Sequence, residues 1–129
     1  MKLKIVDFET SLLARDIGFN WDCENYYDKD LRHKNGYSLC DGNMIDGYQH
    51  NDYSRAPNQE ILKKWLRDEH EYWIILSPRS INQTKYKWVH NVDHNTKKFD
   101  SYEDALEDGL VQCMKILQIK LQNGKTNSY

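Results

Sequence analysis

A long apolar stripe near the end of the printed sequence limits the folds open to this chain more than any other feature. Its members recur every three or four residues, which is the period of one helix face: Tyr102, Leu106, Leu110, Cys113, Met114 and Leu117. Ser101 is a suitable N-cap, with Asp104 three residues later as in a capping box. We expect this helix to end at Asn123 and Gly124.

Two shorter helices are predicted upstream. The first follows Asp7, whose side chain can cap it, and its apolar face holds Phe8, Leu12, Leu13 and Ile17. Gly18 is expected to end it in the left-handed conformation, with Phe19 folded back onto it. The second follows Asn58, also a suitable cap, and its apolar face holds Ile61, Leu62, Trp65 and Leu66.

Strands are predicted on both sides of the second helix. Residues 23–27 and 36–40 form two short strands, and residues 41–55 form a long surface loop. After the helix, residues 72–76 form a strand that Pro78 stops. Residues 86–92 alternate in polarity, and a short third strand ends at Phe99.

The order of these elements predicts an α+β fold. We expect a single two-layer domain over residues 1–122, with helices packed on one face of a small antiparallel sheet. A long irregular insertion lies around residues 20–57, and residues 123–129 form a frayed tail. Trp65 and Leu66 should be buried against the strands at 72–76 and 86–92. In the second of these strands Tyr86, Trp88, His90 and Val92 should face the helices, with Lys87, Val89 and Asn91 outward.

The composition narrows the class of protein. A chain of 129 residues is long enough for one core. Only 39% of its residues are hydrophobic and 12% are aromatic, so the core should be small and built from large rings. A net charge of −2 offers no general support for nucleic-acid binding. No run is apolar enough to span a membrane.

The three cysteines, Cys23, Cys40 and Cys113, indicate the compartment. An odd number of cysteines without an export signal favours free thiols in a reducing environment, so we expect a cytoplasmic protein. Cys113 belongs to the apolar helix stripe and should be part of the core. None of the three has a recognisable nucleophile context.

Motifs for metal or cofactor binding are weak. Cys23, His33, Cys40 and His50 are ligand types that zinc prefers, but their spacing is wide and no Cys-x-x-Cys pair occurs. Six glycines form no phosphate-binding pattern. We therefore predict no metal, no cofactor and no disulfide.

Motifs for catalysis are equally weak. His70 between Glu69 and Glu71 resembles part of a metalloprotease motif, but position 74 is Ile, where the second histidine would stand. The acidic pairs 103–104 and 107–108 are explained by the helix dipole. We predict no catalytic residues and no enzymatic activity.

Several segments together resemble small uncharacterised proteins of tailed phages, prophages and mobile elements of gut bacteria. The resemblance covers about residues 7–118 and depends on the segments 13–19, 55–57, 64–70 and 101–106. These motifs are structural: a helix end, a helix start with a Trp-containing face, and a capped last helix. The resemblance implies a biological context and assigns no activity.

Binding of a partner protein is the function that the sequence favours. The candidate interaction surface is aromatic and consists of Trp21, Tyr26, Tyr27 and Trp73, because aromatic rings are enriched in interface cores. The alternative is a single-stranded nucleic-acid-binding module on the strand at 85–92, where cations and rings alternate in Lys85, Tyr86, Lys87 and Trp88. The partner is unknown, no membrane is involved, and a monomer or a homodimer is expected.

Overall fold

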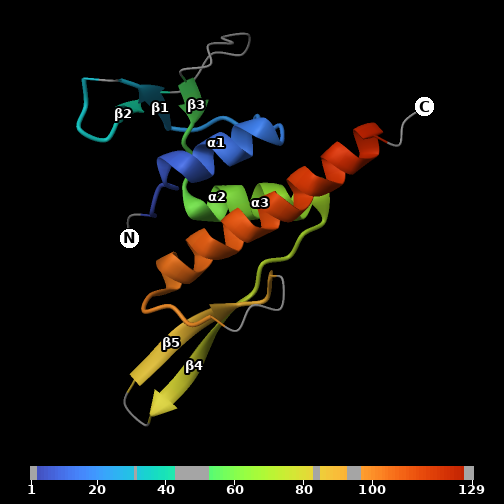
Figure 1. The fold of residues 1–129 in the computed structure, drawn as a ribbon. Coiled ribbons are helices and arrows are strands. Elements are labelled where there is room, and N and C mark those ends of the chain that lie inside the picture. The colour runs from blue at the N-terminus through green and yellow to red at the C-terminus, as the bar shows by residue number, and fades with distance from the viewer. Residues whose placement is uncertain (1–2, 31, 43–52, 83–84, 93–96, 127–129) are drawn as a thin grey trace.

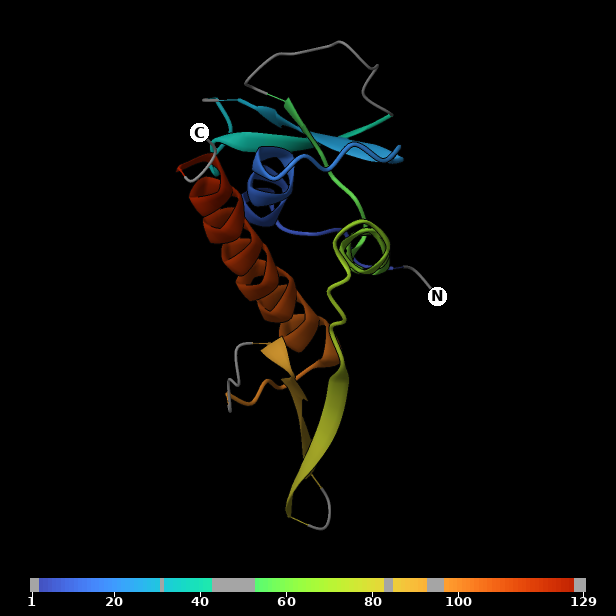
Figure 2. The ribbon, with the colours of Figure 1, turned by 90° about the vertical axis from the view of Figure 1, so that its right-hand side faces the viewer.

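The computed structural model places three helices between two small sheets (Figures 1 and 2). It describes residues 3–30, 32–42, 53–82, 85–92 and 97–126, without the side chains of 80–86 and 124–126. The helices are α1 (Phe8–Asp16), α2 (Gln59–His70) and α3 (Tyr102–Thr126). The strands are β1 (Asn25–Lys29), β2 (Tyr37–Asp41), β3 (Tyr53–Arg55), β4 (Leu76–Asn82) and β5 (Lys85–His90).

The predicted α+β class with antiparallel pairing is confirmed, but the described strands form two sheets instead of one. The first has the order β2-β1-β3, and the second is the hairpin β4-β5. The segment at 20–57 is therefore not irregular throughout, because β1 pairs with both β2 and β3. Helix α1 contacts β3, whereas the N-terminal half of α3 lies against the hairpin (Figure 1).

The predicted strand at 72–76 is wrong. Glu71 ends α2 in the left-handed conformation, residues 72–75 pair with no described strand, and β4 begins at Leu76 and runs through Pro78. Pro78 stands opposite Trp88, whose N–H and C=O instead bond to Phe99 at 2.8 Å each. Since the two backbone groups of one strand residue point the same way, Pro78 occupies a pair without ladder bonds. Its missing N–H therefore costs no pairing with β5.

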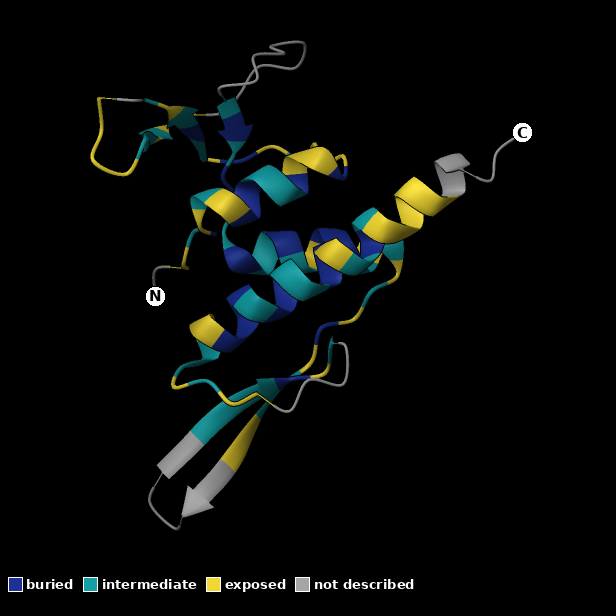
Figure 3. Ribbon diagram, viewed as in Figure 1, coloured by how far each residue is buried: buried dark blue, intermediate teal, exposed yellow. Residues whose placement is uncertain are grey.

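One cluster of buried side chains joins the three helices, and in Figure 3 the buried faces lie where the helices meet. Trp65 is 3% exposed and Leu66 is fully buried, as predicted. They share one buried cluster with Ile74, and Leu76 and Val92 pack against this cluster. The Trp65 ring itself packs edge-on against Phe19 at 5.3 Å, and α2 also contacts α3. Figure 2 shows α2 end-on beside α3, with the hairpin extending away at the N-terminal end of α3.

The helix ends follow the sequence in three cases. Gly18 adopts φ +96°, and the Phe19 N–H donates to the Ala14 carbonyl at 2.9 Å, so α1 ends as predicted. Asn58 accepts from the Ile61 N–H at 2.9 Å at the start of α2. Ser101 accepts from the Asp104 N–H at 3.0 Å at the start of α3.

Two helix ends differ from the prediction. Asp7 occupies the N-cap position of α1, but its side chain makes no capping hydrogen bond. Helix α3 continues through Asn123 and Gly124 to Thr126. A glycine inside a helix costs only about 1 kcal/mol relative to alanine, so it does not have to end one. In the part of the chain that is described, no helix is long and apolar enough to cross a membrane.

Candidate functional site

The four aromatic residues predicted to form an interaction surface have different environments. Tyr27 is only 6% exposed, and its hydroxyl donates to the Val6 carbonyl at 2.6 Å. It is therefore a core residue and not a surface residue, because its position on β1 faces α1. Trp21 is half-buried against the core, and Tyr26 is half-buried beside Tyr53. Trp73 alone among the four is exposed, with 65% of its surface open to solvent.

Trp73 belongs to a short extended segment between α2 and β4, which we call the Trp73–Ile75 ridge (residues 73–75). Trp73 is 65% exposed, Ile74 is 4% exposed and Ile75 is 56% exposed. Successive side chains of an extended chain point to opposite sides. The buried Ile74 therefore anchors the segment in the core, and its two neighbours stand together on the outer side.

The Asn91 side chain holds the ridge in this conformation. Its Oδ1 accepts from the Ile75 N–H at 2.9 Å, and its Nδ2 donates to the Trp73 carbonyl at 3.1 Å. The Asn91 amide thus makes the two backbone hydrogen bonds that a neighbouring strand would otherwise provide. The Arg67 guanidinium lies over the Trp73 ring, 5.4 Å from its centroid, which restrains the indole as a cation–π contact.

A pocket of about 340 Å³ lies beside the ridge. Its apolar lining consists of Trp73, Ile74, Ile75, Leu76 and Tyr102, and its charged lining consists of Lys63 and Arg67 from α2. Each cation forms an ion pair with an acidic residue of α2. Lys63 Nζ lies 3.7 Å from Glu60 Oε2, and Arg67 Nε lies 2.9 Å from Asp68 Oδ1. Neither carboxylate lines the pocket, although Glu60 Oε1 also accepts from the hydroxyl of Tyr102 in the lining at 3.0 Å. The lining itself is therefore apolar with two cations, and each cation is paired with a carboxylate outside it.

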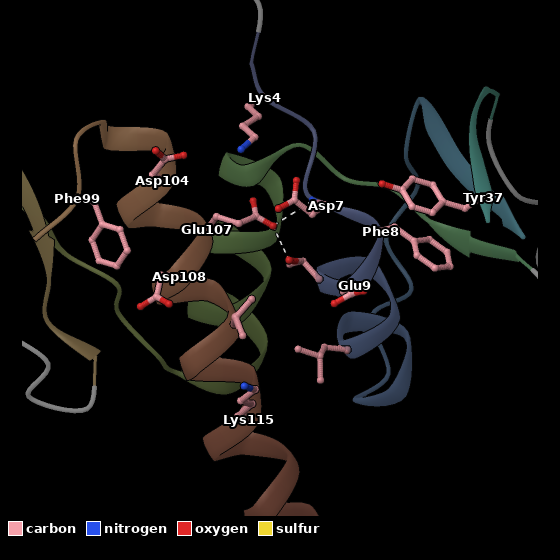
Figure 4. A pocket seen from close by; sticks show the side chains of 13 residues that line it. Lys4, Asp7, Phe8, Glu9, Tyr37, Phe99, Asp104, Glu107, Asp108 and Lys115 are labelled. Carbon is pink, nitrogen blue, oxygen red and sulfur yellow. Dashed lines mark hydrogen bonds between the residues drawn. The ribbon is translucent and has the colours of Figure 1, made fainter. Parts of the chain in front are cut away.

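A larger cleft of about 670 Å³ lies between α1 and α3 (Figure 4). Its lining contains the aromatic residues Phe8, Tyr37 and Phe99 and the acidic residues Asp7, Glu9, Asp104, Glu107 and Asp108. Lys4 and Lys115 are the cations of this lining. Carboxylates therefore outnumber cations in the lining of this cleft, whereas the charged residues that line the pocket beside the ridge are both cationic.

The Glu107 carboxylate forms the floor of this cleft and points from α3 toward the start of α1 (Figure 4). The side chain is buried; its Oε2 accepts from the Asp7 N–H at 3.0 Å and from the Thr10 hydroxyl. Its Oε1 accepts from the Gln59 amide at 2.8 Å. The three donors come from the start of α1 and the start of α2. Glu107 therefore joins α3 to both of these helices.

Sequence reasoning assigned Glu107 and Asp108 to the helix dipole and missed both contacts. A signal was present, because Glu107 lies three residues before Leu110 and seven before Met114, on the face of the apolar stripe. Asp108 accepts from His90 Nε2 at 2.7 Å, while His90 Nδ1 accepts from the Val92 N–H at 3.2 Å. This arrangement requires the proton of a neutral His90 on Nε2.

The Asp7 carboxyl stands at the rim of the cleft. Its pKa is raised above the ordinary value of 3.8, first by partial burial and then by the nearby Glu107 carboxylate. The ionised form of Asp7 is therefore disfavoured in the folded chain.

The strand of the alternative nucleic-acid surface is described only in part. The side chains of Lys85 and Tyr86 lie outside the described residues. The Lys87 ammonium pairs with Asp100 at 3.0 Å, and the half-buried Trp88 ring packs edge-on against Tyr102 at 5.2 Å. Trp88, His90 and Val92 face the helices as predicted. In the alternative nucleic-acid surface, the two residues with described side chains, Lys87 and Trp88, thus both have partners within the fold.

The residues considered for zinc do not gather in the described structure. Cys23 is buried, Cys40 is half-buried and His33 is exposed, while His50 lies outside the described residues. Among the residues with a described placement, no three His, Cys, Asp or Glu side chains form a group that could hold a metal ion. Burial raises the pKa of both Cys23 and Cys113 to about 11, which disfavours the reactive thiolate.

Comparison of the chain with family models, curated proteins and solved structures found no match.

Proposed function

We propose that this chain is a non-enzymatic accessory protein that binds a partner protein through the Trp73–Ile75 ridge. The observation that carries the proposal is an exposed tryptophan in a fixed position. Trp73 is 65% exposed, yet Arg67 covers one face of its ring and Asn91 bonds its backbone. Tryptophan and arginine are enriched in the residues that dominate binding energy.

The fixed backbone supports this function further. An interface residue that is already held in its bound conformation loses little entropy on association. Ile75 adds a second exposed apolar side chain on the same side of the ridge. Contiguous exposed apolar surface on a small protein is typical of an interaction site.

The setting of the protein is part of the same proposal. The resemblance to proteins of phages and mobile elements supports an accessory role in a bacterial host. The odd number of cysteines supports a cytoplasmic location, where thiols remain reduced. Burial, which raises the pKa of Cys23 and Cys113, supports a structural role for these two residues.

Site-specific crosslinking tests the proposal. A photoreactive amino acid is introduced at position 75 or at position 39 in cells that express the protein naturally. Leu39 is the control for Ile75, because it is also an exposed aliphatic residue (46% against 56%) but lies on β2, in the other sheet. We expect a specific crosslinked protein from position 75 only, identified by mass spectrometry.

The identified partner is then purified and its affinity is measured directly. We expect Trp73→Ala to weaken binding by at least about 30-fold, the loss typical of a dominant interface residue, and Leu39→Ala to leave it unchanged. Equal crosslinking from positions 75 and 39, or full affinity in Trp73→Ala, would refute the proposed surface. Salt-dependent binding of single-stranded RNA or DNA that persists in Trp73→Ala would favour the nucleic-acid alternative.

A further inference from the structure

We infer that the partner presents an acidic, apolar segment to the ridge. In this arrangement an apolar side chain of the partner occupies the pocket beside Trp73, and neighbouring carboxylates pair with Arg67 and Lys63. The inference rests on the proposed function and specifies the chemistry of the partner at the same site.

The shape of the site favours a side chain as the occupant. At about 340 Å³ the pocket is near the lower limit of ligand pockets, which hold roughly 300–1,000 Å³. It therefore suits one or two side chains and not a whole helix. Ile75, Leu76 and Tyr102 contribute apolar surface to its lining, and contact with such surface is favourable for aliphatic and aromatic groups.

The charge of the site favours an acidic segment. Both charged residues of the lining, Lys63 and Arg67, are cationic. A guanidinium can bind a carboxylate through two parallel hydrogen bonds, and the Arg67 guanidinium lines the pocket while it lies over the face of the Trp73 ring. A basic segment would instead bring like charges together as the pocket closes and excludes water. Charge thus selects among apolar segments that would otherwise fit equally well.

Labelled peptides test this inference without knowledge of the partner. The probe is a short peptide of alternating Glu and Leu, compared with versions that carry Gln or Lys in place of Glu. We expect the Glu peptide to bind at least about tenfold more tightly than the Gln peptide, and the Lys peptide to bind most weakly. Its affinity should fall as salt is added.

Two pairs of variants assign the binding to the site. Lys63→Gln should weaken binding of the Glu peptide several-fold and flatten its salt dependence, whereas Lys64→Gln removes the same charge from an exposed position outside the pocket and should change the affinity little. Trp73→Ala should weaken it at least about tenfold, and Leu39→Ala should not. Unfolding curves of each variant confirm that the fold is intact.

The outcomes separate the two proposals. Equal affinity for the Glu and Lys peptides, equal losses in Lys63→Gln and Lys64→Gln, or no binding at about 1 mM peptide would overturn the inference. If the crosslinked partner still requires Trp73 in that case, the proposed function stands. If Trp73→Ala affects neither peptide nor partner, both fail. A dimer of this chain that sedimentation shows to depend on Trp73 would make a second copy the occupant and overturn the acidic partner.

Discussion

Glu107 joins segments that are far apart in the sequence. Its carboxylate accepts from the backbone of Asp7, the hydroxyl of Thr10 and the amide of Gln59. The two segments it reaches on α1 and α2 thus share one acceptor on α3. A buried carboxylate with every partner supplied by the protein is part of the fold's own hydrogen-bond network.

We predict that Glu107→Gln destabilises the protein by about 1–3 kcal/mol, the cost of leaving a buried polar group without its partner. The new amide nitrogen would face a donor on one side, either Gln59 or the pair of Asp7 and Thr10. Chemical denaturation measures the change. Glu103→Gln is the matched control, since it alters the same group on the same helix at an exposed position. Equal losses in the two variants would contradict the network.

We predict that Asp7→Asn stabilises the protein at neutral pH by less than about 1 kcal/mol, because solvent screens this exposed side chain. The raised pKa of Asp7 means that the folded chain binds its proton more tightly than the unfolded chain. The stability associated with the protonated carboxyl is therefore fully present below pH 3.8 and is lost as pH rises through the folded-state pKa.

An asparagine at position 7 does not titrate, and it suits the N-cap position as well as aspartate does. The gain in unfolding free energy of Asp7→Asn over wild type should therefore appear as pH rises above 3.8 and disappear below it. Unfolding free energies measured across this range test the prediction. An advantage that is constant with pH would show that the aspartate charge is not its source.

At the scale of elements, α2 is held by the ring that it buries. Trp65 is 3% exposed and packs edge-on against Phe19, the residue that folds back after α1 ends. We predict that Trp65→Ala costs about 3–5 kcal/mol, as in other large core truncations. Trp73→Ala removes the same side chain from a 65% exposed position and should change stability by less than about 0.5 kcal/mol. Thermal and chemical unfolding of both variants measure this difference.

The ridge depends on the Asn91 amide. We predict that Asn91→Ala accelerates hydrogen exchange at the Ile75 N–H, because that donor loses its acceptor. Asn91→Asp keeps an oxygen for Ile75 but places a second oxygen against the Trp73 carbonyl. Exchange at Ile75 should therefore stay slower in Asn91→Asp than in Asn91→Ala. Equal rates in wild type and Asn91→Ala would show that the ridge is held by other contacts.

At the scale of the whole molecule, α3 is the element that joins the two ends. It contacts α1, α2 and the β4-β5 hairpin, and its N-terminal half lies against the hairpin (Figure 1). Gly109 permits the close approach of the hairpin, since a Cβ at this position would lie 3.2 Å from Ile74 and 3.3 Å from His90. The His90–Asp108 pair fixes the same contact.

Local sequence patterns predicted the helices and their ends well, but they did not predict which strands pair. The caps at Asn58 and Ser101 and the end at Gly18 depend on a few neighbouring residues, and all three follow the sequence. Pairing of β1 with both β2 and β3 depends on distant segments, so the division into two sheets could not be predicted. Exposure of Trp73 depends on an amide from Asn91, which no periodicity reveals.

Pro78 has a consequence for the solubility of the chain. Residues 72–76 are uncharged and rich in aromatic and β-branched side chains, a composition typical of segments that aggregate as stacked strands. Pro78 follows this run after a single serine, and its nitrogen lies on the outer edge of β4, where an incoming strand would need a donor. The proline therefore acts as a gatekeeper. A partner can bind the exposed indole through side chains, while copies of the chain are hindered from extending the sheet.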